Sequence, residues 1–193
     1  ILQADAFAGY RPLYEDGRVV EAACWSHARR KYWDIHERQH RLPGTVAHQA
    51  LVRISQLFAI EAEIRGRSAD ERREVRQQRT RRVLDELKVW LDQTLSQLSA
   101  KSALAAAIGY TLANWRALTR FVDDGQIEAH NNAAERALRA VAIGRKNYLH
   151  LGSDAGGASA AVFYTLIGTA KLCDIEPQAY LRHVLGRIGE HPI

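Results

Sequence analysis

Helical periodicity through the middle of the chain is the feature that most constrains the fold. Between Thr45 and about Arg65, apolar side chains recur at the spacing of one helix face: Val46, Ala50, Ile54, Leu57, Ile60 and Ile64. Ser68 and Glu71 then have the three-residue spacing of a capping box, and a second apolar stripe continues to Leu98. The pattern predicts long amphipathic helices over this whole region.

Strand patterns are short and lie outside the helical region. The run from Ile1 to Asp5 and the run RVVEAACW (18–25) predict two strands near the front, and Tyr148–Leu151 predicts a third. Ser26 is a candidate N-cap for a helix that follows the second strand. Because so few strands make a poor sheet without helical cover, we expect an α+β fold that is predominantly helical.

The composition is that of a globular chain, and it predicts no transmembrane helix. Of the 193 residues, 47% are hydrophobic and 25% are charged, and no apolar run approaches the roughly 18 residues that span a bilayer. Two distant cysteines, Cys24 and Cys173, favour a reduced, cytoplasmic location over a disulfide. The sequence starts at Ile1 and contains no Met, so we expect it to belong to a longer or processed protein.

The charge is mildly basic, with a net value of +5 and a pI of about 9.4. This permits a polyanionic partner without requiring one. Most of the positive charge is arginine, whose guanidinium matches phosphate oxygens, although a GC-rich genome that favours arginine codons explains the bias equally well. In the Arg-rich segment 72–82, acidic neighbours cancel much of the charge, so a solvated helix face is favoured over a DNA contact.

Two carboxylates are candidates for metal ligands, and each also has a structural interpretation. Asp5 ends an apolar strand, where a side chain is fixed yet open to substrate, but an Asp in this place is more often a turn residue. Glu135 lies near a helix start, where the helix dipole and an i,i+4 pair with Arg139 favour it. If that helix continues through Gly144, then Glu135, Arg139 and Lys146 share one stripe, as a metal site with phosphate-binding cations requires. A charged solvated face is an equally good explanation.

Three other patterns do not support a metal-binding, nucleotide-binding or nucleophilic site. Cys24 and His27 have a zinc-like spacing, but no second pair is near, so Cys24 is assigned to the core and His27 to a helix start or a polar contact. The stretch SDAGG (153–157) lacks the form of a phosphate-binding P-loop. The chain contains no GxSxG nucleophile elbow.

Several long segments together resemble one known family. They are LQADAFAGY, CWSHARRKYW, HNNAAERALRAVAIGRKNYLHLGSDAGGASAAVFYTLIGTAKL and EPQAYLRHVL, from Leu2 to about Ile188. They resemble the C-terminal half of DDE transposases of the bacterial insertion sequence sixty-six type. The resemblance implies a ribonuclease-H-like core in which two Asp and one Glu hold two divalent ions, Mg²⁺ or Mn²⁺.

The same resemblance implies roles for particular residues. Asp5 matches the second Asp of the triad and Glu135 matches the Glu, while the first Asp would lie before residue 1. We therefore expect this chain alone to be inactive. The family usually has Asp where this chain has His130, and His is a poorer N-cap for the helix that carries Glu135.

The resemblance also implies an organisation and partners. Residues 1–141 would form a truncated ribonuclease-H-like domain with a helical insertion at about 43–128, and 142–193 would form a helical C-terminal region. The reaction would be metal-dependent DNA cleavage that frees a 3′-hydroxyl, followed by strand transfer into target DNA. DNA, at the transposon ends and the target, would be the partner in the bacterial cytoplasm, with a homo-oligomer as the acting form. From charge and position, Arg139, Arg145 and Lys146 are candidate phosphate contacts.

Two other functions are compatible with the same residues. One is a non-catalytic nucleic-acid-binding or regulatory helical protein, such as a remnant of a transposase. The other is a helical interaction module whose charges only keep it in solution. Phosphate contacts weaken steeply with salt, so the salt dependence of DNA binding separates these alternatives.

Overall fold

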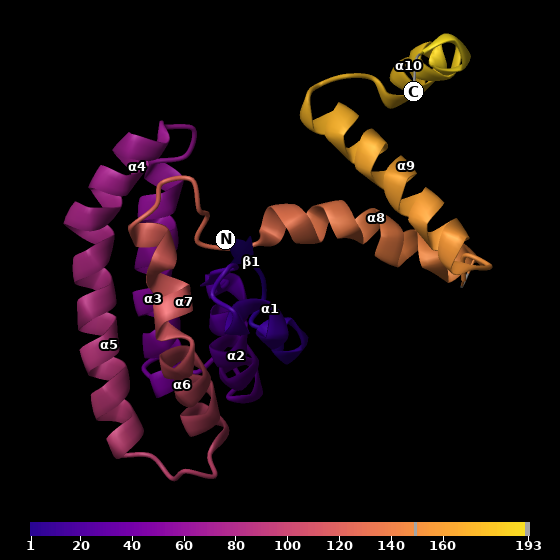
Figure 1. Ribbon diagram of the computed structural model, residues 1–193. Helices are drawn as coiled ribbons and strands as arrows, with labels where there is room; N and C mark the ends of the chain where they lie inside the picture. The colour runs from indigo at the N-terminus through magenta and orange to yellow at the C-terminus, as the bar shows by residue number, and fades with distance from the viewer. Residues whose placement is uncertain (149, 192–193) are drawn as a thin grey trace. The chain divides into compact units, whose positions relative to one another are not determined.

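The computed structural model describes residues 1–148 and 150–191 (Figure 1). Helices account for 71% of these described residues and strands for 2%, which confirms that the chain is predominantly helical. The chain divides into two compact units, unit 1 (Ile1–Asn132) and unit 2 (Ala133–Ile193). None of the helices in the described ranges is long and apolar enough to cross a membrane.

Unit 1 begins with a small parallel sheet. Strand β1 (Leu2–Gln3) pairs with β2 (Glu21–Ala22), and Leu2 lies opposite Glu21. A 3₁₀ turn, η1 (Ala8–Tyr10), and helix α1 (Arg11–Glu15) connect the two strands. Both predicted strands therefore exist, but each has two residues, and helix α2 (Trp25–Arg38) already begins inside the segment predicted as the second strand.

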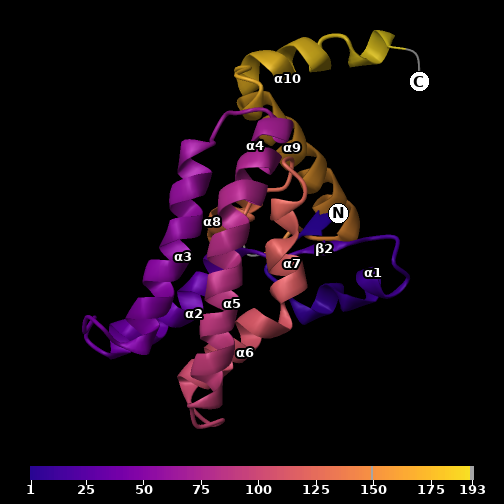
Figure 2. The ribbon, with the colours of Figure 1, turned by 90° about the vertical axis from the view of Figure 1, so that its left-hand side faces the viewer.

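Helices pack side by side in the rest of unit 1. Helix α3 (Val46–Glu63) runs beside a continuous column of α4 (Ala69–Val75), the π-helical segment η2 (Arg76–Thr80) and α5 (Arg81–Ser96), as Figures 1 and 2 show. Helix α6 (Ala103–Ala113) packs against α2 and α5 and leads into α7 (Trp115–Thr119) and η3 (Arg120–Val122). The helices predicted over 45–98 are confirmed.

The apolar stripe that predicted these helices forms the core. On α3 the stripe residues Ala50, Ile54, Leu57 and Ile60 are buried, as is Ile64 just after the helix. They meet Leu84, Leu87 and Leu91 of α5 together with Trp25 and Tyr32 of α2. The predicted capping box also forms, because the Ser68 side chain accepts from the Glu71 N–H while the Glu71 carboxylate accepts from the Ser68 N–H.

Unit 2 consists of helices with little buried surface. It holds most of α8 (Asn132–Tyr148), then α9 (Asp154–Leu172), α10 (Pro177–Leu185) and a 3₁₀ turn, η4 (Ile188–Glu190). Helices α9 and α10 pack on each other, and Ala170 at the end of α9 is buried. Helices α9 and α10 each begin with a side-chain N-cap. The Ser153 hydroxyl accepts from the Gly156 N–H, and the Glu176 carboxylate accepts from the Ala179 N–H.

The third predicted strand, Tyr148–Leu151, is wrong for the residues that the structure describes. Helix α8 continues through Gly144 and includes Tyr148, while His150 and Leu151 lie in no strand. Residue 149 lies outside the described ranges. A glycine inside a helix costs only about 1 kcal/mol, so Gly144 by itself does not end α8.

Candidate functional site

Asp5 is held in a turn directly after β1. The Ala4 N–H donates to the Ala22 carbonyl at 3.0 Å, so sheet pairing continues up to the residue before Asp5. The Asp5 Oδ1 accepts from the Phe7 N–H at 3.2 Å, and Asp5 is exposed. Ala6 has a positive φ of 60°, a conformation that a non-glycine residue adopts only at a cost of about 1–3 kcal/mol. The carboxylate is thus both a turn-forming group and an open oxygen ligand.

Tyr110 of α6 fixes the backbone of the same turn. Its hydroxyl donates to the Asp5 carbonyl at 3.1 Å, a contact between residues 105 positions apart. Burial and, second to it, the Asp5 charge raise the pKa of Tyr110. The hydroxyl therefore stays protonated and keeps donating at neutral pH, which ties the Asp5 turn to the helical bundle.

Glu135 lies in the first turn of α8, and its side chain is exposed. Because α8 is continuous from Asn132 to Tyr148, Glu135, Arg139 and Lys146 do share one helix stripe, as the predicted metal and phosphate site requires. Arg139, Arg145 and Lys146 are all exposed. Asp5 belongs to unit 1 and Glu135 to unit 2, and their roles stay predictions.

The chain enters α8 through a segment that is bound to the start of α2. The Trp25 N–H donates to the Ala129 carbonyl at 3.0 Å, and the Asn131 N–H donates to the Cys24 Sγ at 3.5 Å. Cys24 is fully buried and, like Cys173, is a free thiol. Its assignment to the core is therefore confirmed, with an added use as an acceptor for the backbone that leads to Glu135.

Two residues at helix starts differ from the predictions. Helix α2 begins at Trp25 with Cys24 at its N-cap position, so Ser26, the predicted cap, lies inside the first turn. Helix α8 begins at Asn132, so Asn131 precedes it and His130 lies one residue further out. The His130 ring stacks on Phe58, with centroids 6.2 Å apart. The replacement of Asp by His at 130 therefore acts on packing rather than on the capping position.

The Arg-rich segment 72–82 contains a buried arginine that sequence reasoning missed. Arg76 is 0% exposed, and its guanidinium binds both carboxylate oxygens of Glu61, at 2.8 and 2.6 Å. Its Nη1 also donates to the carbonyls of Phe121, Asp124 and Ile127, at 2.9, 3.1 and 2.9 Å. Arg76 thus joins α3 and η2 to the loop that precedes α8.

Most other cations of this segment are also paired with acids. Arg72 binds Glu128 at 2.8 Å, Arg79 binds Glu63, and Arg81 binds Asp123. The prediction that 72–82 is merely a solvated face is wrong for Arg76, but the preference against a DNA contact here agrees with the pairing.

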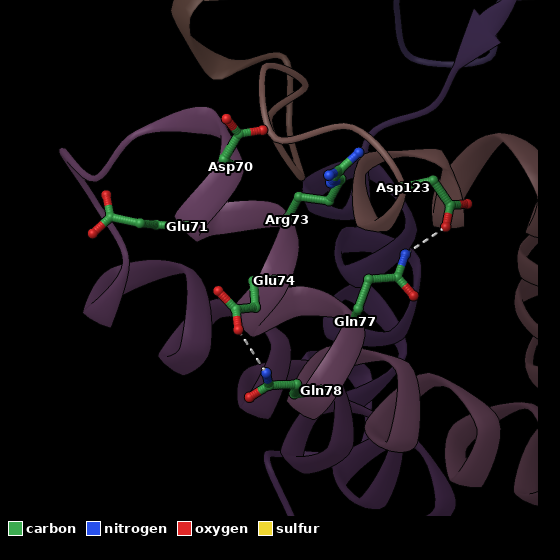
Figure 3. A pocket seen from close by; sticks show the side chains of 7 residues that line it. All are labelled: Asp70, Glu71, Arg73, Glu74, Gln77, Gln78 and Asp123. Atoms are coloured by element: carbon green, nitrogen blue, oxygen red, sulfur yellow. Dashed lines mark hydrogen bonds between the residues drawn. The ribbon is translucent and has the colours of Figure 1, made fainter.

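An open depression beside this segment has an acidic rim. Figure 3 shows Asp70, Glu71 and Glu74 on α4 and Asp123 across from them, with Gln77 donating to Asp123 at 2.7 Å. The surplus of negative charge opposes binding of a phosphate backbone. No group of three or more His, Cys, Asp or Glu side chains within the described ranges is arranged to hold a metal ion.

Comparison with known proteins identifies the family. Residues 1–159 match the family model described as "Transposase IS66 family", and residues 165–193 match the "IS66 C-terminal element". The chain belongs to the IS66 transposase family. Asp5, Glu135 and the three α8 cations all fall within the first match.

The curated relatives come from Sinorhizobium fredii (strain NBRC 101917 / NGR234). "Uncharacterized protein y4hP" is 38% identical over 206 residues, which cover 100% of this chain and 37% of the relative. "Uncharacterized protein y4jD" is 40% identical over 195 residues, which cover 97% of this chain and 37% of the relative. The chain thus spans little more than a third of the length of these relatives. No solved structure matches it.

Proposed function

We propose that this chain supplies part of the catalytic site of a DNA transposase that cleaves DNA strands and transfers them with divalent metal ions. The observation that carries the proposal is an exposed carboxylate, Asp5, in a strained turn at the carboxyl end of β1, within the segment that matches the IS66 family. The proposal includes a truncated ribonuclease-H-like domain at 1–141, with an insertion at about 43–128, and a C-terminal region at 142–193.

Asp5 and Glu135 are the residues proposed to hold Mg²⁺ or Mn²⁺. Both are exposed carboxylates, and carboxylate oxygens are the ligands that these hard cations prefer, so the donor chemistry fits. When bound, the ions would supply Lewis-acid stabilisation of the charge on phosphodiester oxygens. The Phe7 N–H and the Tyr110 hydroxyl fix the Asp5 turn, which keeps the carboxylate in one place before substrate arrives.

The cations of α8 are proposed to bind the phosphates of the same DNA. Helix α8 contains one acidic residue, Glu135, against the cations Arg136, Arg139, Arg145 and Lys146. Arg139 and Lys146 lie on the Glu135 stripe, and Arg145 lies beside Lys146. Neutralising phosphates next to the carboxylates lowers the repulsion between the DNA and the metal-binding acids.

Metal binding tests the assignment of the two carboxylates. Mn²⁺ binding to the chain is measured from the electron paramagnetic resonance signal of free Mn²⁺. We expect Asp5→Asn and Glu135→Gln each to weaken binding, because each removes a charged ligand. Glu86→Gln changes an exposed glutamate of α5 by the same charge and is the matched control. Equal affinity of all four proteins would overturn the assignment.

Strand transfer tests the reaction. In a chimera, this chain replaces the matching segment of the relative y4hP, and transposition of a marked element is counted in cells. We expect Asp5→Ala and Glu135→Ala to abolish transposition while Glu86→Ala preserves it. The chain by itself is expected not to cleave DNA, since two carboxylates make a poor two-metal site. Robust Mg²⁺-dependent cleavage by the chain, lost in Glu135→Ala, would contradict that expectation.

A non-catalytic nucleic-acid-binding protein is the second candidate, and the exposed cations of α8 favour it as much as they favour a transposase. Salt-sensitive DNA binding without any specific Mn²⁺ binding would support this candidate over the first.

A further inference from the structure

The solvent face of α2 carries a row of three cations, Arg30, Lys31 and Arg38. Ala28, Tyr32 and His36 face the core, and Arg30, Lys31 and Arg38 project from the exposed side. At 1.5 Å of rise per residue, the row from 30 to 38 spans about 12 Å. In the part of the chain that the structure describes, no carboxylate lies within 4.0 Å of these three charged groups.

The acids on α2 leave this row largely uncompensated. Glu37 is engaged by Arg41, which follows the helix. Asp34 is then the remaining acid on the face that carries the three cations. In contrast, Arg79, Arg81 and Lys88 on η2 and α5 each contact a carboxylate, so phosphate would have to displace an existing partner there.

The helix that carries the row contacts the support of the Asp5 turn and the segment that precedes α8. The Lys31 Nζ lies 4.2 Å from the centroid of the Tyr110 ring, and the Tyr110 hydroxyl donates to the Asp5 carbonyl. At its other end, α2 begins where Trp25 binds Ala129, two residues before the chain reaches Asn131 and enters α8. One helix therefore connects the cation row to the Asp5 turn and to the segment that precedes Glu135.

We propose that Arg30, Lys31 and Arg38 form a surface that binds the sugar-phosphate backbone of DNA beside Asp5. This proposal rests on the proposed function and adds a contact on unit 1 to the α8 cations. Along the helix axis one DNA strand presents a phosphate about every 3.4 Å, so a row of about 12 Å is long enough for its three cations to contact two or three phosphates. The Tyr110 ring holds the Lys31 ammonium by a cation–π contact, which reduces the side-chain freedom that binding would have to remove.

The salt dependence of DNA binding tests this surface. A fluorescein-labelled 30-base-pair duplex is titrated with the chain at several KCl concentrations in EDTA, and fluorescence anisotropy gives the association constant. Each phosphate contact contributes a slope of about −0.9 to a plot of log K against log salt. We expect the triple variant Arg30→Gln/Lys31→Gln/Arg38→Gln to flatten the slope by about 2 to 3.

A matched triple variant controls for net charge. Arg79→Gln/Arg81→Gln/Lys88→Gln also removes three cations, two exposed and one partly buried. Each of these is paired with an acid, so the slope is expected to stay close to that of the wild type. The charge-conserving variant Arg30→Lys/Lys31→Arg/Arg38→Lys is expected to keep the wild-type slope. It separates a charge effect from damage to α2.

The outcomes distinguish this proposal from the proposed function. Two results would overturn the α2 surface and leave the transposase proposal standing. In the first, the wild-type chain binds DNA and the α2 triple variant keeps the wild-type salt slope. In the second, the α2 triple variant and the matched triple variant flatten the slope by the same amount. If the wild-type chain shows no salt-dependent binding, the DNA-binding function fails and the α2 surface fails with it. Mn²⁺ binding, which depends on Asp5 and Glu135, is expected to be unchanged in the α2 variants.

Discussion

Replacing Arg76 by methionine is expected to destabilise unit 1 more than any exposed arginine replacement. The side chain is completely buried, and methionine keeps most of its length while removing the charge. The change leaves the Glu61 carboxylate, whose side chain is only 11% exposed, without its two-bond partner. It also removes the common donor of three backbone carbonyls, that of Phe121 in η3 and those of Asp124 and Ile127 in the loop after it.

The size of the effect follows from the buried pair. Removing one partner of a buried ion pair costs about 3–5 kcal/mol, and the Arg72 Nη2, at 3.7 Å from the Glu61 Oε2, compensates only part of the charge left behind. For a unit of this size, each kcal/mol lowers the melting temperature by roughly 3–5 °C, so a fall of about 10–25 °C is expected. The double variant Arg76→Met/Glu61→Leu is expected to recover part of the loss but not all of it, since the three carbonyls remain without their donor.

Urea unfolding followed by tryptophan fluorescence measures this loss in unit 1 alone, because all four tryptophans belong to that unit: Trp25, Trp33, Trp90 and Trp115. The control is Arg79→Met, which breaks an ion pair whose side chains are 49% and 53% exposed. Such a surface pair contributes at most about 1 kcal/mol. If Arg76→Met costs no more than Arg79→Met, then the guanidinium does not hold the loop and the reasoning is refuted.

Two further predictions concern packing and pH. A Cβ at Gly125 would lie 1.7 Å from the carbonyl oxygen of Ala69, so Gly125→Ala is expected to cost about 1–3 kcal/mol or more in urea unfolding. Gly109→Ala, in an open helical position of α6, is expected to stabilise the protein by about 0.5–1 kcal/mol. If both variants change the free energy of unfolding equally, the close contact between Gly125 and Ala69 is contradicted. Burial raises the pKa of Tyr32 to about 12, above the ordinary value of 10 that holds in the unfolded chain. The stability that the protonated hydroxyl contributes is therefore complete below about pH 10 and is lost between about pH 10 and 12. The loss is up to about 2.7 kcal/mol at 1.36 kcal/mol per pKa unit. Tyr32→Phe should reduce the alkaline slope without removing it, since the pKa values of Tyr110 and Tyr14 are raised as well; an unchanged slope in that variant would exclude Tyr32 as a source.

Local signals in the sequence were reliable where local physics decides the conformation. The Ser68–Glu71 capping box forms as its three-residue spacing predicts, because both partners lie in the same helical turn. The apolar stripe from Ala50 to Ile60 likewise faces the core. Predictions at element ends were weaker: the second strand is two residues long, and Tyr148, predicted to begin a third strand, belongs to α8.

The candidate site was also only partly predictable from the sequence. Asp5 at a strand end and Glu135 in the first turn of a helix were predicted from pattern and family resemblance. In the structure both side chains are exposed, Asp5 in the turn after β1 and Glu135 in the first turn of α8. Their supports could not be predicted. Tyr110 reaches Asp5 across 105 positions, and Cys24 reaches Asn131 across 107.

The sequence alone determined that this chain is helical, where its long amphipathic helices lie, and which carboxylates resemble transposase ligands, because periodicity, capping and motifs depend on neighbouring residues. Tertiary structure decided which charges are available. Arg76 and Arg30 are similar in the sequence, each among other cations and near acids. Only the fold buries Arg76 against carbonyls 45–51 positions away and leaves Arg30 in solvent. The physical reason is that a charge is neutralised by whatever lies within a few ångströms in space, and chain folding rather than chain order sets those neighbours.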